Sequence, residues 1–315
     1  MNNFRSHYST GFFSLAFATL LYGFYGVVSK IVGIDFGVFF LGWSRSLVIA
    51  LIVFVYFFFV RQWIVVRKEH YKWFATMSTF GIASFLAIFV AFNRLPIGVA
   101  LFTYYASSTL ASYCIGYVLF KEKFTASKIL LLGISLMGLL LLFYDRFQSG
   151  SIALLLLACF SGVAGAVWNV FSKKVSPVYP TTQIIFIDAL IAIAISLPLS
   201  LLTSEPVALS SFTEKLPIIV LFAGITVGSN IFTLIGFKYL AAQIASIIML
   251  LEAVYGVIFG WLFFKEILSP LEMIGGMFII LSVAFSHFVA KNSQTNVQIY
   301  ERRNKKKLLR RVILK

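Results

Sequence analysis

The chain has 315 residues, of which 60% are hydrophobic and only 12% are charged, and its formal net charge is +15. About a quarter of the residues in a soluble domain are charged, so this composition excludes a soluble globular protein and indicates a membrane protein. Successive apolar runs fill the chain and leave no room for a separate soluble domain.

Ten apolar runs follow one another, each long enough to cross a bilayer, which takes about 20 helical residues. They predict an all-α integral membrane protein with ten transmembrane helices, at residues 11–32, 36–60, 71–92, 97–120, 126–144, 151–171, 181–202, 217–237, 242–264 and 270–289. The first run follows a single basic residue, Arg5, and is too long for the core of a signal peptide, so we expect the chain to retain it.

The loops predict the orientation of these helices. With the N-terminus inside, the inner segments carry 20 of the 26 lysine and arginine residues, and the outer loops carry five. Because cytoplasmic loops are enriched in these residues, we expect both termini in the cytoplasm and the chain in the inner (plasma) membrane of a bacterium. The net charge then follows from orientation and does not indicate a nucleic-acid partner.

The C-terminal tail, residues 291–315, is strongly basic and ends in ERRNKKKLLRRVILK. One interpretation is that it lies as an amphipathic segment on the anionic lipids of the inner leaflet. The alternative is that it acts only as a retention or topology signal. Apart from lipids and a small-molecule substrate, no partner is predicted, and a homodimer is left open.

Few residues indicate catalysis or metal binding. The three histidines, His7, His70 and His287, do not have the spacing of a metal site, and the chain has no nucleotide-binding loop. Cys114 and Cys159 lie within apolar runs and are interpreted as buried packing thiols without a disulfide or a metal. We therefore expect no enzyme activity and no cofactor.

The chain contains an internal duplication. The fourth run ends in LFKE at residues 119–122 and the ninth in FFKE at residues 263–266, a spacing of 144. Two units of five helices explain this pattern: residues 11–145 and residues 151–290, flanked by an N-terminal segment, residues 1–10, and the tail. Spacings of 143 or 144 also align further pairs of residues: Ser29 and Lys30 with Ser172 and Lys173, Arg45 with Asp188, and Ser108 with Glu252.

Because each unit has an odd number of helices, the second must enter the membrane in the opposite sense to the first. Such inverted repeats build many secondary transporters, in which one unit moves against the other around a site near the bilayer midplane. Ser108 and Glu252 both lie about halfway along their helices. The duplication therefore predicts a central cavity in which the second unit supplies the acid.

Glu252 is the strongest candidate site residue. A charge at the centre of a transmembrane helix costs roughly 2.5 to 3.5 kcal/mol on insertion scales, so such a residue usually faces the bundle interior. Helical spacing places Tyr255, Gly256, Phe259 and Gly260 on the same face, which would form a wall for a substrate. We expect Glu252 to bind a proton or a cationic substrate, and the alternative is a protonated structural acid.

These features resemble the EamA-type drug/metabolite transporters over nearly the whole chain, from Gly11 to Val289. The resemblance rests on the two five-helix units, the LFKE and FFKE endings and the acid within MLLEAVYGVIFGW. It implies a carrier of amino acids, related metabolites, nucleotide precursors or small organic cations. The ninth helix of that family typically reads Leu-Glu-Pro-Val at this point. Here Ala253 replaces the proline, so we expect the kink to be absent or softer.

Other polar side chains complete the predicted site. Arg45 and Asp188 would form an ion pair within the membrane, or Arg45 would hold a substrate carboxylate; the alternative is local pairing or a side chain that reaches the interface. Aromatic rings near Glu252 would suit an organic cation or a hydrophobic amino acid. The residues proposed to line the cavity, each with helix packing as its alternative, are Tyr104, Ser108, Trp168, Asn230 and Tyr255.

Small residues spaced by four positions predict close approach of neighbouring helices. Three such pairs lie within apolar runs: Gly162 with Ala166, Gly224 with Gly228, and Gly256 with Gly260. We interpret most of them as sites of tight helix packing.

Taken together, the residues and the resemblance predict a proton-linked secondary transporter that exports amino acids or related small metabolites by alternating access. Import of a small organic cation or a nucleotide-related metabolite is the first alternative. The second is a membrane partner protein that transports nothing.

Overall fold

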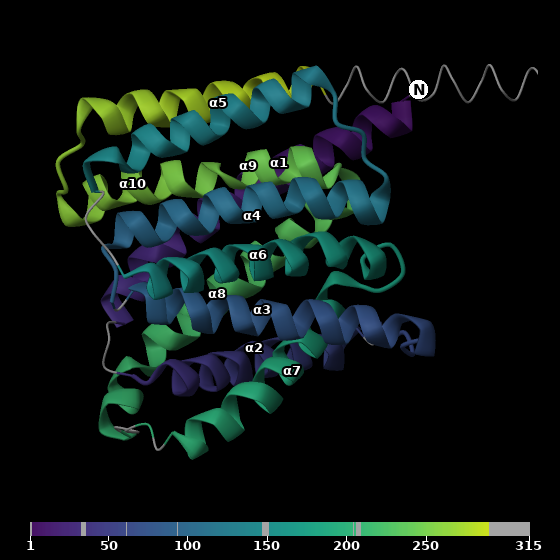
Figure 1. Cartoon of the computed structure of the whole chain (residues 1–315). Helices are drawn as coiled ribbons and strands as arrows, with labels where there is room; N and C mark the ends of the chain where they lie inside the picture. Colours follow the sequence, from purple (N-terminus) through teal and green to yellow (C-terminus); the bar gives the residue numbers. More distant parts are fainter. Residues whose placement is uncertain are drawn as a thin grey trace, which may run out of the picture.

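The computed structural model describes residues 2–32, 36–60, 62–92, 94–146, 151–203, 205 and 209–289. This part of the chain consists of helices and short connections, without a strand, and the long helices lie side by side with roughly parallel axes (Figure 1). The labelled helices are α1 Asn2–Val32, α2 Val38–Val60, α3 Tyr71–Phe92, α4 Ile97–Phe120, α5 Ala126–Phe143, α6 Ile152–Val175, α7 Thr181–Leu202, α8 Leu209–Tyr239, α9 Ala242–Met249 and α10 Leu251–Phe264. An unlabelled helix, Pro270–Val289, follows them, and two 3-10 turns, η1 Lys68–His70 and η2 Tyr144–Arg146, flank α3 and α5.

All ten predicted runs are helical, but they do not all qualify as spans. Within the described residues, eight helices are long and apolar enough to cross a membrane. The two predicted spans outside these eight lie in α1 and α4, and α4 carries the polar stretch TYYASST near its middle. The fold is therefore an all-α, multi-pass membrane bundle that fits the ten-span count only loosely.

The two halves of the chain pack in a pattern that repeats when the halves are exchanged. α1 packs along α8, and its counterpart α6 packs along α3. In the same way, α6 lies against α4 while α1 lies against α9 and α10, and α2 and α7 pack on each other. The first helix of each half thus packs among later helices of the other half.

The last helices of the two halves, α5 and Pro270–Val289, meet closely. A Cβ atom added to Gly138 would lie 2.8 Å from the Gly275 carbonyl oxygen, and the Ser282 hydroxyl donates to the Leu131 carbonyl oxygen at 2.9 Å. Positions 138 and 282 are 144 apart, as are positions 131 and 275. The spacing found in the sequence therefore maps one of these contacts onto the other.

The small-residue pairs predicted to allow close helix packing behave differently from one another. A Cβ atom on Gly162 would overlap the Ser107 hydroxyl of α4, so this glycine does permit a close approach. A Cβ atom on Gly224 or Gly256 would meet no atom within 4 Å, because both glycines face away from neighbouring helices.

Cys114 was predicted to be buried, and this is wrong. Its thiol lies on an exposed face of α4, next to the exposed Tyr117 and Val118, whereas Cys159 is partly buried on α6. Both are free thiols. Apolar sequence surroundings do not distinguish a side chain that faces lipid from one that faces the core, because both environments are apolar.

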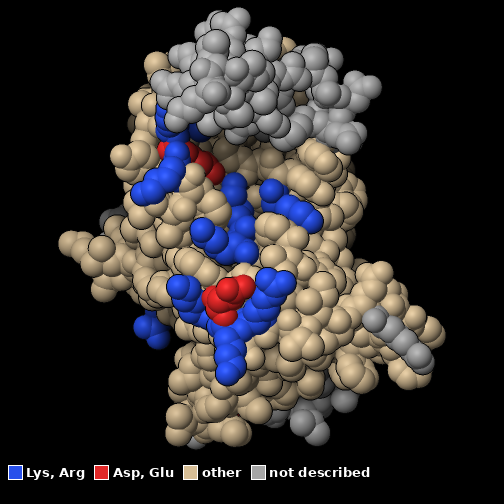
Figure 2. Space-filling model, turned by 90° about the vertical axis from the view of Figure 1, so that its right-hand side faces the viewer, with Lys and Arg blue, Asp and Glu red and all other residues tan. Residues whose placement is uncertain are grey.

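One end of the bundle, which we call the basic end, contains the connections 62–70, 121–125, 176–180 and 240–241 (Figure 1). Figure 2 looks onto this end and shows lysine and arginine side chains gathered across it. The described residues of the other connections, 36–37, 94–96, 144–146, 151, 203, 205 and 265–269, lie at the opposite end (Figure 1). The tail interpreted as a lipid-binding segment, residues 291–315, lies outside the described residues.

Candidate functional site

The helix that carries Glu252 is interrupted near its middle. α9 ends at Met249 and α10 begins at Leu251. The Leu250 N–H donates to the Ile247 carbonyl oxygen, and the Ala253 N–H donates to the Leu250 carbonyl oxygen, both at 3.1 Å. These bonds reach back three residues instead of four, so the backbone tightens into a 3-10 turn there. The interruption forms without a proline and places Glu252 in the first turn of α10. That the kink is absent or softer than in the family stays a prediction.

The Glu252 carboxyl group faces phenols from two other helices. The Tyr105 hydroxyl of α4 lies against it, and Tyr22, Tyr25 and Tyr104 are close enough to interact with it electrostatically. The Tyr22 hydroxyl also donates to the Asn230 side-chain oxygen of α8. We call this set, Tyr22, Tyr25, Tyr104, Tyr105, Asn230 and Glu252, the central polar cluster.

The central polar cluster has the chemistry of a proton or ligand site. Glu252, Tyr22, Tyr25, Tyr104 and Asn230 are only partly buried, so part of each side chain is accessible. A carboxylate accepts hydrogen bonds only, whereas phenols both donate and accept. Such a group of side chains can hold a proton, an ammonium group or an ordered water molecule.

Arg45 and Asp188 do not pair directly. The Arg45 Nη1 donates to the Tyr25 hydroxyl at 2.6 Å, and its guanidinium carbon lies 4.0 Å from the centre of the Phe85 ring. The Asp188 carboxylate instead accepts a hydrogen bond from the Trp168 indole at 3.1 Å. Asp188 senses the Arg45 charge at longer range. The intramembrane ion pair considered from the sequence is therefore absent at contact distance.

The remaining predicted residues lie around these contacts. Ser108 lines a small cavity with Tyr105, Asn169 and Ser246, with room for about one water molecule. Tyr104 lies beside Gly165 and Ser84, across from α6 and α3. Tyr255 packs its Cβ on Gly23 of α1, and its ring stacks beside Phe259.

Sequence reasoning missed the tyrosines of α1. Tyr22 and Tyr25 lie in an apolar, aromatic-rich run and do not stand out by composition. The duplication did hold a signal: Tyr25 precedes Trp168 by 143 positions, the spacing that also relates Arg45 to Asp188. The hydrogen bond between Arg45 and Tyr25 thus corresponds to the bond between Asp188 and Trp168.

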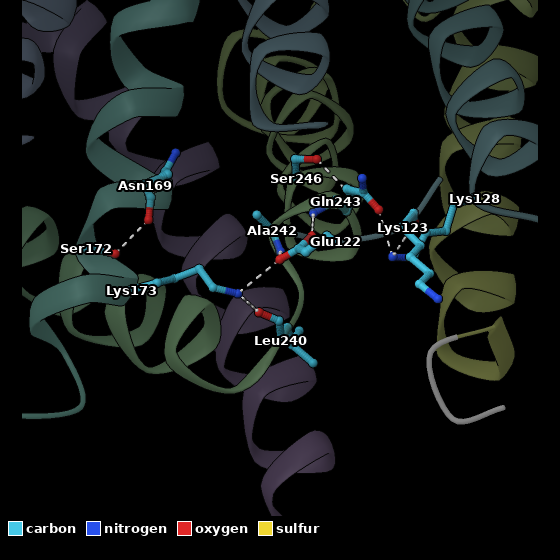
Figure 3. Close-up of polar contacts among 10 residues, drawn as sticks. All are labelled: Glu122, Lys123, Lys128, Asn169, Ser172, Lys173, Leu240, Ala242, Gln243 and Ser246. Carbon is cyan, nitrogen blue, oxygen red and sulfur yellow. Dashed lines mark hydrogen bonds and ion pairs between the residues drawn. The ribbon is translucent and has the colours of Figure 1, made fainter. Parts of the chain in front are cut away.

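A second polar set, the Glu122 cluster, closes the basic end (Figure 3). The Glu122 carboxylate, at the LFKE ending after α4, accepts the backbone N–H groups of Ala242 at 2.7 Å and Gln243 at 3.1 Å. Lys173 of α6 approaches the same carboxylate at 3.4 Å and donates to the Leu240 carbonyl oxygen. The Lys128 ammonium donates to the Gln243 side chain at 2.7 Å.

The Glu122 cluster has a clear physical basis. The first N–H groups of a helix lack partners within it and carry partial positive charge, so a carboxylate at the start of α9 is favourable. Glu122 therefore links the end of α4 to the start of α9. Lys173 links α6 to the same carboxylate, and Lys128 links α5 to Gln243 of α9. In the described residues, no group of three or more His, Cys, Asp or Glu side chains is placed to hold a metal ion.

Comparison with known proteins agrees with this architecture. Residues 9–144 and 152–288 each match the EamA-like transporter family. No curated protein matches the chain significantly. Among solved structures, a crystal structure described only as that of a protein superposes with a TM-score of 0.74 at 19% sequence identity, and the match covers 91% of this chain and 98% of the other. At this identity the likeness shows the fold alone.

Proposed function

The chain belongs to the EamA-like transporter family, and we propose that it is a proton-linked secondary transporter that exports amino acids or related small metabolites by alternating access. In this proposal ten helices cross the membrane as two inverted units, residues 11–145 and 151–290, with both termini in the cytoplasm. Two observations support the inverted arrangement: the contacts that repeat when the halves are exchanged, and the junction at which the end of α4 meets the start of α9.

The observation that carries the proposal is the position of Glu252. It lies at an interrupted helix near the middle of the predicted span, facing tyrosines of α1 and α4. Broken helices that present polar groups near the bilayer midplane form the substrate and ion sites of many secondary transporters. An acid in such a place can exchange a proton between the two sides when access alternates.

Alternating access requires a closure at each end of the bundle. We propose the Glu122 cluster as the closure at the basic end, because it joins α4, α6 and α9, and α4 also carries Tyr104 and Tyr105 of the central polar cluster. Opening this end would separate Glu122 from the start of α9. The counterpart at the opposite end would involve the FFKE ending after α10.

Counterflow in proteoliposomes tests the proposal. Purified chain is reconstituted with an internal mixture of unlabelled amino acids, and uptake of the labelled mixture is measured with and without an imposed proton gradient. We expect exchange by the wild type, and a loss of the gradient response in Glu252→Gln while exchange persists. Glu272→Gln serves as a matched control, since it neutralises another acid within the spans, which accepts the Ser269 N–H at the start of its own helix, and should leave the gradient response in place.

Other outcomes separate the alternatives. A wild type that exchanges no amino acid but takes up quaternary amines would favour import of an organic cation. That second candidate is supported by the tyrosine rings beside Glu252, since ring faces attract cations. A folded chain that moves neither class, nor nucleosides, would contradict transport and favour a partner protein.

A further inference from the structure

Arg45 is a buried cation without an acidic partner at contact distance. Its side chain is only 9% exposed, at the eighth residue of α2. One of its nitrogens, Nη1, donates to the Tyr25 hydroxyl, and the Phe85 ring covers one face of the guanidinium. Its Nε has no hydrogen-bond partner. Among the described residues, no carboxylate oxygen lies within the 4.0 Å of an ion pair with it.

The hydrogen-bonding capacity of the Arg45 guanidinium is therefore only partly satisfied. A buried arginine normally satisfies its charge with a carboxylate or a phosphate, often through two parallel hydrogen bonds. A phenol and aromatic rings offset the cost of burial only in part. Nη1 already donates to Tyr25. The edge of the guanidinium formed by Nε and Nη2 could therefore donate two parallel hydrogen bonds to a carboxylate.

Tyr25 connects this edge to Glu252. The Tyr25 hydroxyl accepts the Arg45 hydrogen bond and also senses the Glu252 charge. A cation and an acid thus both act on one phenol, among side chains that are only partly buried. A zwitterion has the matching pair of charges.

We propose that Arg45 binds the carboxylate of the transported molecule, so that the substrate is an α-amino acid whose ammonium group lies toward Glu252. This rests on the transport function proposed above and adds the class of substrate. The Nε atom is fully covered in this conformation, so the site opens only when the transporter changes state, as alternating access requires.

Competition during counterflow tests this inference. The probe is a uniformly labelled mixture of the common amino acids, and the competitors are the same amino acids, their methyl esters and their decarboxylated amines. For the wild type we expect the amino acids to compete about tenfold or more better than either derivative, because both derivatives lack the carboxylate. Equal competition by all three would overturn the inference while transport itself stands.

Variants then assign the discrimination to Arg45. Arg45→Gln should remove the preference for the free carboxylate or reduce amino-acid exchange about tenfold, and Arg45→Lys should retain part of it, because a lysine keeps the charge but not the paired donors. Arg67→Gln, an exposed arginine at the basic end, should behave as the wild type. An unchanged preference in Arg45→Gln would contradict the inference.

The two proposals can fail separately. Exchange of amines or nucleosides without any preference for carboxylates leaves transport intact and removes the amino-acid assignment. No exchange of any tested class contradicts both. Thermal melting of each variant in detergent shows whether it is folded, and the wild-type competition decides the inference even if an Arg45 variant fails to fold.

Discussion

The Trp168 ring packs so closely on Gly81 that there is no room for a larger side chain at that position. Its indole donates to Asp188 and lies on Gly81 of α3, where an added Cβ atom would overlap the ring. We predict that Gly81→Val displaces the ring, breaks the bond to Asp188 and destabilises the fold by about 1–3 kcal/mol, as overpacking usually does. Thermal denaturation in detergent measures the loss, and a shift of tryptophan emission that is absent in a Trp168→Phe background identifies the ring.

Gly133→Val is the matched control for Gly81→Val. Gly133 is also a helical glycine, but an added Cβ atom there meets nothing within 4 Å. We expect its melting temperature to stay close to the wild type, since surface substitutions usually change stability by no more than about 0.5 kcal/mol. A Gly81→Val protein that melts like the control would show that the ring is not seated on Gly81.

The sequence singles out Glu252 as a candidate but does not show which side chains surround it. A lone carboxylate in an apolar run is a rare and costly feature, so Glu252 stood out by composition. Which phenols face it depends on the rotation and neighbours of α1 and α4, which hydropathy does not encode. Tyr22 and Tyr25 were missed for this reason, and Arg45 was aligned with Asp188 by the repeat although each bonds an aromatic side chain instead.

At the scale of elements, the interruption at Leu250 had no signal in the sequence. No glycine or proline stands there, and residues 242–264 read as one continuous apolar helix. α9 is buried along nearly its whole length, so its packing against α4 and α1 determines its direction. Tertiary contacts of this kind can override local helix propensity.

The Glu122 cluster supports a prediction about opening of the basic end. Glu122→Gln keeps an oxygen for the N–H groups at the start of α9 but loses the ion pair with Lys173 and the charge that favours a helix N-terminus. We predict that this end opens more often. A cysteine placed at the buried Ser246 of α9, in a Cys114→Ser, Cys159→Ser background, should then react several-fold faster with an impermeant maleimide added from the basic side.

Lys123→Gln is the control for Glu122→Gln. It removes a neighbouring charge from the same connection, but the side chain of Lys123 is exposed and only its carbonyl oxygen takes part in the cluster. Labelling of the Ser246 cysteine should therefore be unchanged by it. Equal labelling rates in Glu122→Gln and in the wild-type background would mean that the cluster does not hold this end closed.

For the whole molecule, hydropathy predicts the order and the bounds of the helices, but it does not predict which helices pack against one another. The predicted runs 71–92, 97–120 and 181–202 coincide with α3, α4 and α7. The packing of α1 among α8, α9 and α10, and of α6 among α3 and α4, was not predicted. Apolar faces are interchangeable in lipid, so the pairing of helices depends on shape and on a few polar contacts that only the folded chain reveals.

The inverted arrangement of the two units gives the last prediction. Lys123 and Ile267 are 144 positions apart and occupy equivalent connections, and both are exposed. Since Glu122 contacts the start of α9, Lys123 lies at the basic end, whereas Ile267 follows α10 at the opposite end. If the basic end is cytoplasmic, as the distribution of lysine and arginine favours, Lys123 faces the cytoplasm and Ile267 faces the outside. In the cysteine-free background, Ile267→Cys should react with an impermeant maleimide in right-side-out vesicles, and Lys123→Cys only in inside-out vesicles. The reverse pattern would place both termini outside, and labelling of both positions from one side would contradict an inverted repeat.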